Sequence, residues 1–198
     1  MHASIHDALL AKVAALAKKL VVGDPLEPAT QQGPLCNPTQ LKRVLEHIER
    51  AKTECRLVTG GSRIGRVGNF VEPTIFADVP RDSALAKEEV FGPVGAFLKW
   101  ETMQDVIELA NATDYALAAG IWSKDVDAAL GLASHLQAGT VWINGMMTTW
   151  GYNTPFGGGK LTGGGRTNGK EGLMQYLVPK SVNVKLPAAA ALRVPAKL

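Results

Sequence analysis

The sequence contains little cysteine and no long uninterrupted apolar run, and each absence excludes a class of protein. Its 198 residues include two cysteines, Cys36 and Cys55, which form no CxxC pair. Two cysteines do not build a disulfide framework in a chain of this length. Asp7, Lys12 and Lys18 interrupt the first apolar stretch, which argues against a signal peptide or a membrane span there. The sequence therefore favours a cytoplasmic protein.

An excess of charge of either sign is also missing. The formal net charge at pH 7 is +3, and the lysines and arginines are interspersed with acidic residues. Nothing marks a nucleic-acid-binding or anionic-membrane-binding protein. A small molecule or another protein is the expected partner.

The histidines do not suggest a metal site. They are His2, His6, His47 and His135. None has cysteines or carboxylates at metal-ligand spacing. We expect no bound metal, and histidines that are exposed or hydrogen-bonded.

Complete nucleotide-binding motifs are absent as well. No GxGxxG follows a predicted strand, so a self-contained dinucleotide-binding domain is not supported. Gly164, Gly169 and Lys170 match the first seven positions of a P-loop, but Glu171 follows them. That position needs a hydroxyl for Mg²⁺, and a carboxylate would repel the phosphates. We therefore do not interpret this match as a nucleoside triphosphate site.

Two amphipathic helices are predicted in the first part of the chain. Ser4 with Asp7 gives the first a capping-box start, and Gly23 would end it. The stripe expected to face the core comprises Ile5, Leu9, Val13, Leu16 and Leu20. The second helix begins at Asn37 and Pro38, a cap followed by a proline suited to a first helical position. Its core stripe comprises Leu41, Val44, Leu45, Ile48 and Cys55.

Further along the chain, strands predominate and then alternate with helices. Strands are predicted at residues 56–61, 70–79, 94–100, 117–123 and 140–146. A helix with Thr102 and Asp105 at capping spacing and a second one starting at Asp125 separate the last three strands. Such connections are crossovers, so these three strands should be parallel with right-handed connections. The sequence predicts an α/β fold with a parallel sheet flanked by helices.

The C-terminal quarter changes character. Residues 154–172 are so rich in glycine that we expect a long loop whose backbone turns sharply or approaches a neighbour closely. A short helix is predicted within residues 170–176 and a strand at residues 180–186. Residues 187–198 show no periodicity and should form a mobile tail.

Two features could carry chemistry. Cys36 lies just before a predicted helix, whose N-terminus could lower the pKa of its thiol, but nothing nearby in the sequence is placed to activate it. Glu88 and Glu89 are adjacent, so in an extended segment they point to opposite sides. Glu89 could then accept two hydrogen bonds from a vicinal diol such as a ribose, with Phe91 against a flat ring. A solvated loop carboxylate is the alternative.

Several stretches together resemble one enzyme family. "KEEVFGP" resembles the Glu-x-Phe-Gly-Pro signature of the NAD(P)-dependent aldehyde dehydrogenase superfamily. The stretches "LVVGDPLEPATQQGPLCNPTQ", "FVEPTIFADV", "AGTVWINGM…PFGGGKLTGGGR" and "GLMQYLVPKSVNVKL" are similar to other parts of it. The resemblance runs in order from residue 1 to about residue 186. Five collinear motifs make it specific.

The resemblance implies a cofactor, NAD or NADP, and residues that contact it. Glu89 would hold the hydroxyls of the nicotinamide ribose, and Phe91 would pack beside the nicotinamide. Gln40 matches a position that contacts the cofactor more variably in the family. Arg43 stands where a lysine is common, and a planar guanidinium is not equivalent to an ammonium.

The same resemblance implies an aldehyde entrance and reveals departures. Phe156 and Trp150 correspond to the loop that lines the entrance. In the family a cysteine thiolate attacks the aldehyde and a glutamate activates water. The segment that carries this cysteine would end just upstream of Met1, and neither Cys36 nor Cys55 aligns with it. The general base, the oxyanion-site asparagine and the cofactor domain lie earlier still, so no catalytic residue is assigned.

We accordingly expect a truncated catalytic domain at residues 1–178, an oligomerisation strand at residues 179–186 and a tail at residues 187–198. Two interpretations stay open. The chain could be part of an aldehyde-oxidising enzyme whose upstream half is a separate polypeptide or missing from the sequence, or a non-catalytic remnant that self-associates. In both we expect a homo-oligomer with no turnover and weak or absent cofactor binding by the chain alone. The aldehyde is not specified.

Overall fold

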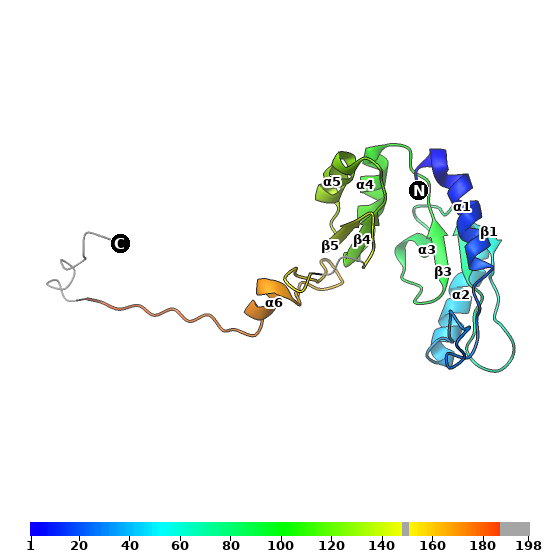
Figure 1. Ribbon diagram of the computed structural model, residues 1–198, viewed down its shortest axis with the longest axis horizontal. Coiled ribbons are helices and arrows are strands. Elements are labelled where there is room, and N and C mark those ends of the chain that lie inside the picture. Colours follow the sequence, from blue (N-terminus) through cyan, green and yellow to red (C-terminus); the bar gives the residue numbers. More distant parts are fainter. Residues whose placement is uncertain (148–150, 187–198) are drawn as a thin grey trace.

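The computed structural model describes residues 1–147 and 151–186, which form two α/β lobes followed by an extended segment (Figure 1). The N-terminal lobe, residues 1–100, contains α1 (Ala3–Ala17), α2 (Pro38–Glu54), β1 (Arg56–Thr59), β2 (Thr74–Ala77), α3 (Ala84–Lys87) and β3 (Val94–Phe97). The C-terminal lobe, residues 101–147 and 151–176, contains α4 (Met103–Asn111), β4 (Ala118–Ile121), α5 (Val126–His135), β5 (Thr140–Ile143) and α6 (Gly169–Met174). The mixed α/β class predicted from the sequence is confirmed.

The strands form two sheets rather than one. In the N-terminal lobe β1 pairs antiparallel with β2, and β2 pairs parallel with β3. In the C-terminal lobe β4 pairs parallel with β5. The expectation that the strands of residues 94–100, 117–123 and 140–146 share one parallel layer is therefore wrong for the first of them. A helix between two strands requires a crossover but does not require the strands to be neighbours.

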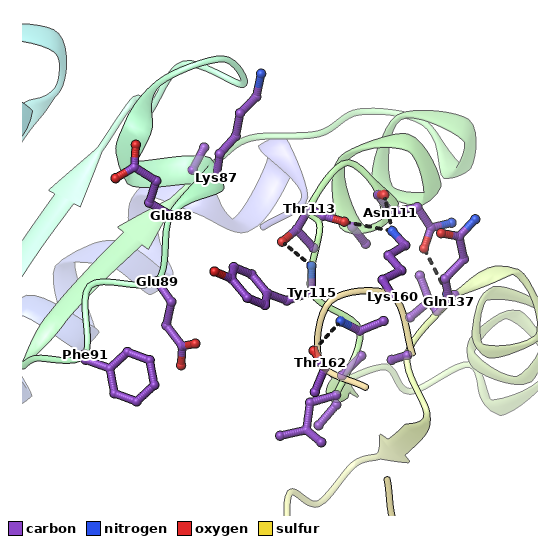
Figure 2. Close-up of a pocket in the computed structure, with 18 residues that line it drawn as sticks. Lys87, Glu88, Glu89, Phe91, Asn111, Thr113, Tyr115, Gln137, Lys160 and Thr162 are labelled. Carbon is purple, nitrogen blue, oxygen red and sulfur yellow. Dashed lines mark hydrogen bonds between the residues drawn. The ribbon is translucent and has the colours of Figure 1, made fainter. Parts of the chain in front are cut away.

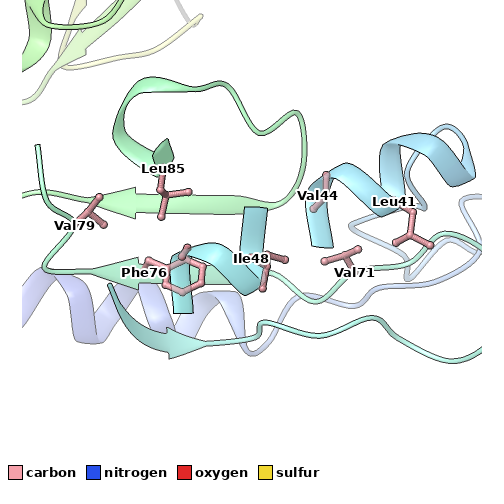
Figure 3. Close-up of a cluster of buried hydrophobic side chains, with 8 residues drawn as sticks. Leu41, Val44, Ile48, Val71, Phe76, Val79 and Leu85 are labelled. Atoms are coloured by element: carbon pink, nitrogen blue, oxygen red, sulfur yellow. The ribbon is translucent and has the colours of Figure 1, made fainter. Parts of the chain in front are cut away.

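Helix α2 follows its sequence signals closely. The Asn37 side chain accepts a hydrogen bond from the backbone of Gln40 at 2.8 Å, which caps the helix start. The predicted stripe is largely confirmed, since Leu41, Val44 and Ile48 are buried. They pack with Val71, Phe76, Val79 and Leu85 in the core of the N-terminal lobe (Figure 3). Burial of each large side chain stabilises the lobe by about 1.5–3 kcal/mol.

Helix α1 departs from its prediction in both length and face. It ends at Ala17 rather than near Gly23. Its buried residues are His6, Leu10 and Ala14, whereas Ile5 is 53% exposed. Apolar residues occur all round this helix, so its sequence does not choose a face. The packing of Leu10 and Ala14 against β2 determines which face of α1 is buried.

His6 is hydrogen-bonded, as expected, but only through one of its two ring nitrogens. Its side chain is inaccessible to solvent. Its Nδ1 lies 2.7 Å from Asp7 Oδ1, but within the described residues its buried Nε2 has no hydrogen-bond partner. The bond to His6 is the largest cause that lowers the pKa of Asp7.

The glycine-rich loop is pinned to the C-terminal lobe by side chains. Lys160 donates from Nζ to the carbonyls of Asn111 and Thr113 at 2.7 and 2.8 Å, which satisfies acceptors at the end of α4. The expected close approach is present: a Cβ on Gly139 would lie 1.8 Å from the carbonyl oxygen of Gly157. The short helix predicted after the loop is α6.

Residues 177–186 form an extended, exposed segment that leads away from the lobes (Figure 1). Residues 180–186, predicted as a strand, do not pair with any described part of the chain. A β-strand requires hydrogen bonds to a neighbouring strand, so this segment is extended but is not a strand within the chain. Val182, Val184 and Leu186 alternate along it and are 60–75% exposed. The predicted tail and Trp150 lie outside the described residues. None of the helices described is long and apolar enough to cross a membrane.

Candidate functional site

A cleft of about 850 Å³ lies between the two lobes (Figure 2). One wall is the turn that joins α3 to β3, residues 86–91. The other is built from the end of α4, the start of β4 and the glycine-rich loop, with Tyr115, Ala118 and Lys160 among its residues. This second wall mixes small or apolar side chains with polar ones, and Lys160 and Thr162 already hydrogen-bond within the lobe.

The adjacent carboxylates of this turn point apart (Figure 2). Glu88 points away from the C-terminal lobe, and its oxygens lie 3.8 Å from His47 and 3.7 Å from Arg50, both on α2. Glu89 extends on the other side of the backbone, toward Phe91. Among the residues that the structure describes, the Glu89 carboxylate has no hydrogen bond or ion pair. Its oxygens are therefore free to accept bonds from a ligand.

Phe91 adopts a backbone conformation that side chains rarely take. Its φ is +53°, in the left-handed region that costs a non-glycine residue about 1–3 kcal/mol. The Gln40 amide donates a hydrogen bond to the Phe91 carbonyl. At Gly92 a Cβ would lie 2.7 Å from a methyl group of Val44, so the turn rests directly on α2. The result is a Phe91 ring held 69% exposed at the cleft.

One face of α2 thus supports the turn along its length. Gln40, Val44, His47 and Arg50 are spaced three or four residues apart, and each contacts residues 88–92. Of these four, only Gln40 was predicted from the sequence as a site residue; Val44 was predicted as a core residue. The sequence shows that these four residues share one face of a helix. It does not show that residues 88–92 cover that face.

The other predicted cofactor residue on α2, Arg43, lies three positions after Gln40 and is exposed. Within residues 1–147 and 151–186 it makes no hydrogen bond or ion pair. The structure therefore brings Gln40 to Phe91, whereas Arg43 is not among the residues that line the described cleft.

Of the two predicted aldehyde-entrance residues, Phe156 lies within the described part of the chain. Phe156 is half-buried, and its backbone exchanges hydrogen bonds of 2.8 and 2.7 Å with Thr167. It is not among the residues that line the described cleft.

Neither cysteine lines the cleft. Cys36 is exposed beside the start of α2 and accepts a hydrogen bond from Asn37 Nδ2 at 3.3 Å. Cys55 is half-buried, and burial, with a smaller contribution from Glu54, raises the pKa of its thiol. A raised thiol pKa lowers the thiolate fraction and hence reactivity.

The described residues thus offer binding groups more clearly than reactive ones. In the described ranges no three histidine, cysteine or carboxylate side chains gather in a way that could hold a metal ion. A free carboxylate and an exposed aromatic ring on a rigid turn suit a ligand with a diol and a flat ring.

Sequence and fold comparisons define the class. The model of the aldehyde dehydrogenase family matches residues 1–182. The chain therefore belongs to the aldehyde dehydrogenase family.

Named relatives agree with this assignment. An aldehyde dehydrogenase of Enchytraeus buchholzi is 45% identical over 188 residues, which are 94% of this chain and 38% of the relative. A betaine aldehyde dehydrogenase of Cereibacter sphaeroides is 48% identical over 181 residues, which are 91% of this chain and 37% of the relative. The chain thus spans less than two fifths of the relatives it matches.

Solved structures show the same fold. A betaine aldehyde dehydrogenase from Staphylococcus aureus in complex with NAD⁺ superimposes with a TM-score of 0.85 at 36% identity, over 90% of this chain and 37% of that one. An NAD⁺ complex of aldehyde dehydrogenase from Bacillus cereus gives a TM-score of 0.84 at 38% identity, over 88% of this chain and 36% of that one.

Proposed function

We propose that this chain supplies the nicotinamide-ribose-holding part of an NAD(P)-dependent enzyme that oxidises aldehydes to carboxylic acids. The observation that carries the proposal is the free carboxylate of Glu89 beside the exposed ring of Phe91, on a turn pinned to α2. The family and the NAD⁺ complexes of related enzymes support it.

The residues present fit the cofactor. The two oxygens of Glu89 can accept hydrogen bonds from the neighbouring hydroxyls of a ribose, and a charged acceptor makes such bonds stronger than neutral ones. Phe91 offers an exposed ring against which the flat nicotinamide can pack, and Gln40 fixes the backbone that carries both. Arg43, exposed on α2, is proposed as a further cofactor contact. When bound, the nicotinamide supplies the acceptor for a hydride.

We also propose that the chain alone does not oxidise aldehydes. Both thiols lie away from the cleft, and one has a raised pKa. Cofactor binding by the chain alone should be weak, because one ribose contact does not offset the freedom that a dinucleotide loses on binding. Aldehyde-dependent NADH formation by the purified chain would contradict this proposal.

A paired substitution tests the ribose contact. In NAD⁺ titrations monitored by amide chemical shifts, the amides of residues 89–92 of the native chain should shift. Glu89→Gln should reduce this response, because it removes the negative charge of the acceptor. Glu88→Gln is the matched control and should respond like the native chain, since Glu88 faces α2. Equal responses of the two variants would refute the role of Glu89.

A non-catalytic, self-associating protein is the second candidate. It is favoured by the exposed alternation of Val182, Val184 and Leu186, which suits a strand that adds to another subunit's sheet. Sedimentation should show a homo-oligomer that a chain ending at residue 176 does not form. A monomer at micromolar concentration would contradict self-association. A cytoplasmic location stays a proposal from the sequence, to be checked by cell fractionation.

A further inference from the structure

The sequence contains two asparagine–glycine pairs, Asn144 with Gly145 and Asn168 with Gly169. Such pairs are open to a reaction of their own backbone, because glycine has no Cβ to shield its peptide nitrogen. The deprotonated glycine nitrogen forms a bond to the asparagine Cγ, the bond from Cγ to the side-chain nitrogen breaks, and ammonia leaves. Water then opens the resulting succinimide to aspartate or isoaspartate.

The carboxamide of Asn144 is held at both of its polar atoms. Its Oδ1 accepts a hydrogen bond from the Ser123 amide at 2.9 Å, and its Nδ2 donates to the Ser123 carbonyl at 2.8 Å. These bonds join the end of β5 to the segment that follows β4. Rotation of Cγ toward the nitrogen of Gly145 must break both of them, so the fold protects this pair.

The carboxamide of Asn168 has no such restraint. Asn168 immediately precedes α6, and its side chain makes no capping hydrogen bond there. It makes none with any other residue that the structure describes. Its backbone, at φ +61° and ψ 169°, lies in a strained region that is otherwise almost confined to glycine. Rearrangement of this residue therefore breaks no side-chain hydrogen bond and can release backbone strain.

Two features oppose reaction at Asn168. This residue is half-buried, whereas Asn144 is exposed. The amide of Gly169 also donates to the Tyr152 carbonyl at 3.1 Å, and this bond must break before the nitrogen can attack. One such bond stands against the two shorter bonds of Asn144 and the strained backbone of Asn168. The balance therefore favours reaction at Asn168.

We propose that Asn168 is a site of spontaneous deamidation in the folded chain, and that the fold directs this reaction to Asn168 rather than to Asn144. The isoaspartyl product carries an extra methylene in the main chain. Because the Asn168 carbonyl accepts a hydrogen bond from the Gly172 amide at 2.9 Å, this product should loosen the start of α6. The inference does not depend on the proposed function.

Ageing of the purified full chain tests the proposal. Peptide mapping by mass spectrometry, in water enriched in heavy oxygen to mark opening of the succinimide, measures conversion at both pairs. Conversion should be about fivefold faster at Asn168 than at Asn144, since one more hydrogen bond must break at Asn144. It should be faster at mildly alkaline than at neutral pH, because the peptide nitrogen attacks after losing its proton.

The same measurement in urea separates the effect of the fold from that of the local sequence. Both asparagines follow a β-branched residue, Ile143 or Thr167. The two pairs should therefore react at similar rates once the chain is unfolded. The same preference for Asn168 in urea as in the folded chain would overturn the proposal.

Asn168→Gly is the matched variant, because glycine tolerates this backbone conformation and has no carboxamide. It should lose conversion at position 168 and leave the rate at Asn144 unchanged. Hydrogen exchange of the Gly172 amide should become faster as the native chain ages, and should not change with age in Asn168→Gly. No conversion at Asn168 in the folded native chain, or equal or faster conversion at Asn144, overturns the proposal.

Discussion

The two lobes bury their side chains to different extents. In the N-terminal lobe Val44, Ile48 and Phe76 are inaccessible to solvent. In the C-terminal lobe Ile121 and Leu132 retain 8–9% exposure, and α4 has no buried residue. The turn with Glu89 therefore rests on a filled core, whereas the opposite cleft wall belongs to a lobe with little core of its own. The comparison teaches that the wall with Glu89 and Phe91 is supported by the more completely buried core of the two lobes.

Truncation of core side chains should give the largest effects on stability, and these effects test the difference between the lobes. Phe76→Ala should lower the free energy of unfolding of the N-terminal lobe by about 3–5 kcal/mol, because an inaccessible aromatic leaves a large cavity. Leu132→Ala should cost the C-terminal lobe about 2–3 kcal/mol, because its less enclosed site can collapse. Urea unfolding with hydrogen exchange resolved by lobe measures both. A larger loss for Leu132→Ala would reverse the assignment of the better packed lobe.

Alanine substitutions of one glycine in each lobe should have the next largest effects, with opposite signs in the two lobes. Gly92→Ala places a Cβ 2.7 Å from Val44, and should cost about 1–3 kcal/mol and displace the turn. Gly131→Ala is the matched control in α5, where a Cβ would meet nothing within 4 Å. It should stabilise the helix by about 0.5–1 kcal/mol. Thermal unfolding of the two variants provides the measurement, and similar changes in both would refute the close contact at Gly92.

The link between Gln40 and Phe91 should have a smaller effect on stability and a clear effect on conformation. Gln40→Met keeps the shape but loses the donor, and should cost about 1 kcal/mol. Gln40→Lys retains a donor and should preserve the link. The carbon chemical shifts of Phe91 report its left-handed backbone, and they should change in Gln40→Met only. Identical Phe91 shifts in both variants would show that Val44 and Gly92 hold the turn without Gln40.

The smallest expected effect is a pH dependence in the C-terminal lobe. Backbone hydrogen bonds from Thr102 and Glu101 are the largest causes that lower the pKa of Asp105. A lowered carboxyl pKa contributes stability above the ordinary aspartate pKa, and this stability is lost as pH falls through the lowered value. Asp105→Asn should flatten the acid side of the stability profile of α4. An unchanged profile in urea titrations at acidic pH would contradict this.

Features of the fold that are determined by residues close together in the sequence could be predicted from it. Helix α2 was predictable because its cap at Asn37 and its buried stripe are encoded within a few residues. The buried face of α1 was not predictable, since apolar side chains surround the helix and packing against β2 selects Leu10 and Ala14. β3 and β4 belong to different sheets because they pair with different strands. The order of helices and strands along the sequence does not specify which strands pair.

The candidate site shows the same division. The opposite directions of Glu88 and Glu89 follow from an extended backbone and were expected. The bond from Gln40 to Phe91 joins residues 51 positions apart, and no local pattern announces it. The roles of Glu89, Phe91, Gln40, Arg43, Phe156 and Trp150 toward a cofactor or substrate stay predictions.

The central claim is that Glu89 and Phe91 face the nicotinamide ribose. The most direct measurement is a nuclear Overhauser experiment with nicotinamide mononucleotide, which contains that ribose and ring and suits weak binding. The account predicts contacts between the nicotinamide protons and the Phe91 ring, with loss of the ribose signals in Glu89→Gln. Contacts confined to other residues, or contacts at Phe91 that Glu89→Gln leaves unchanged, would contradict it.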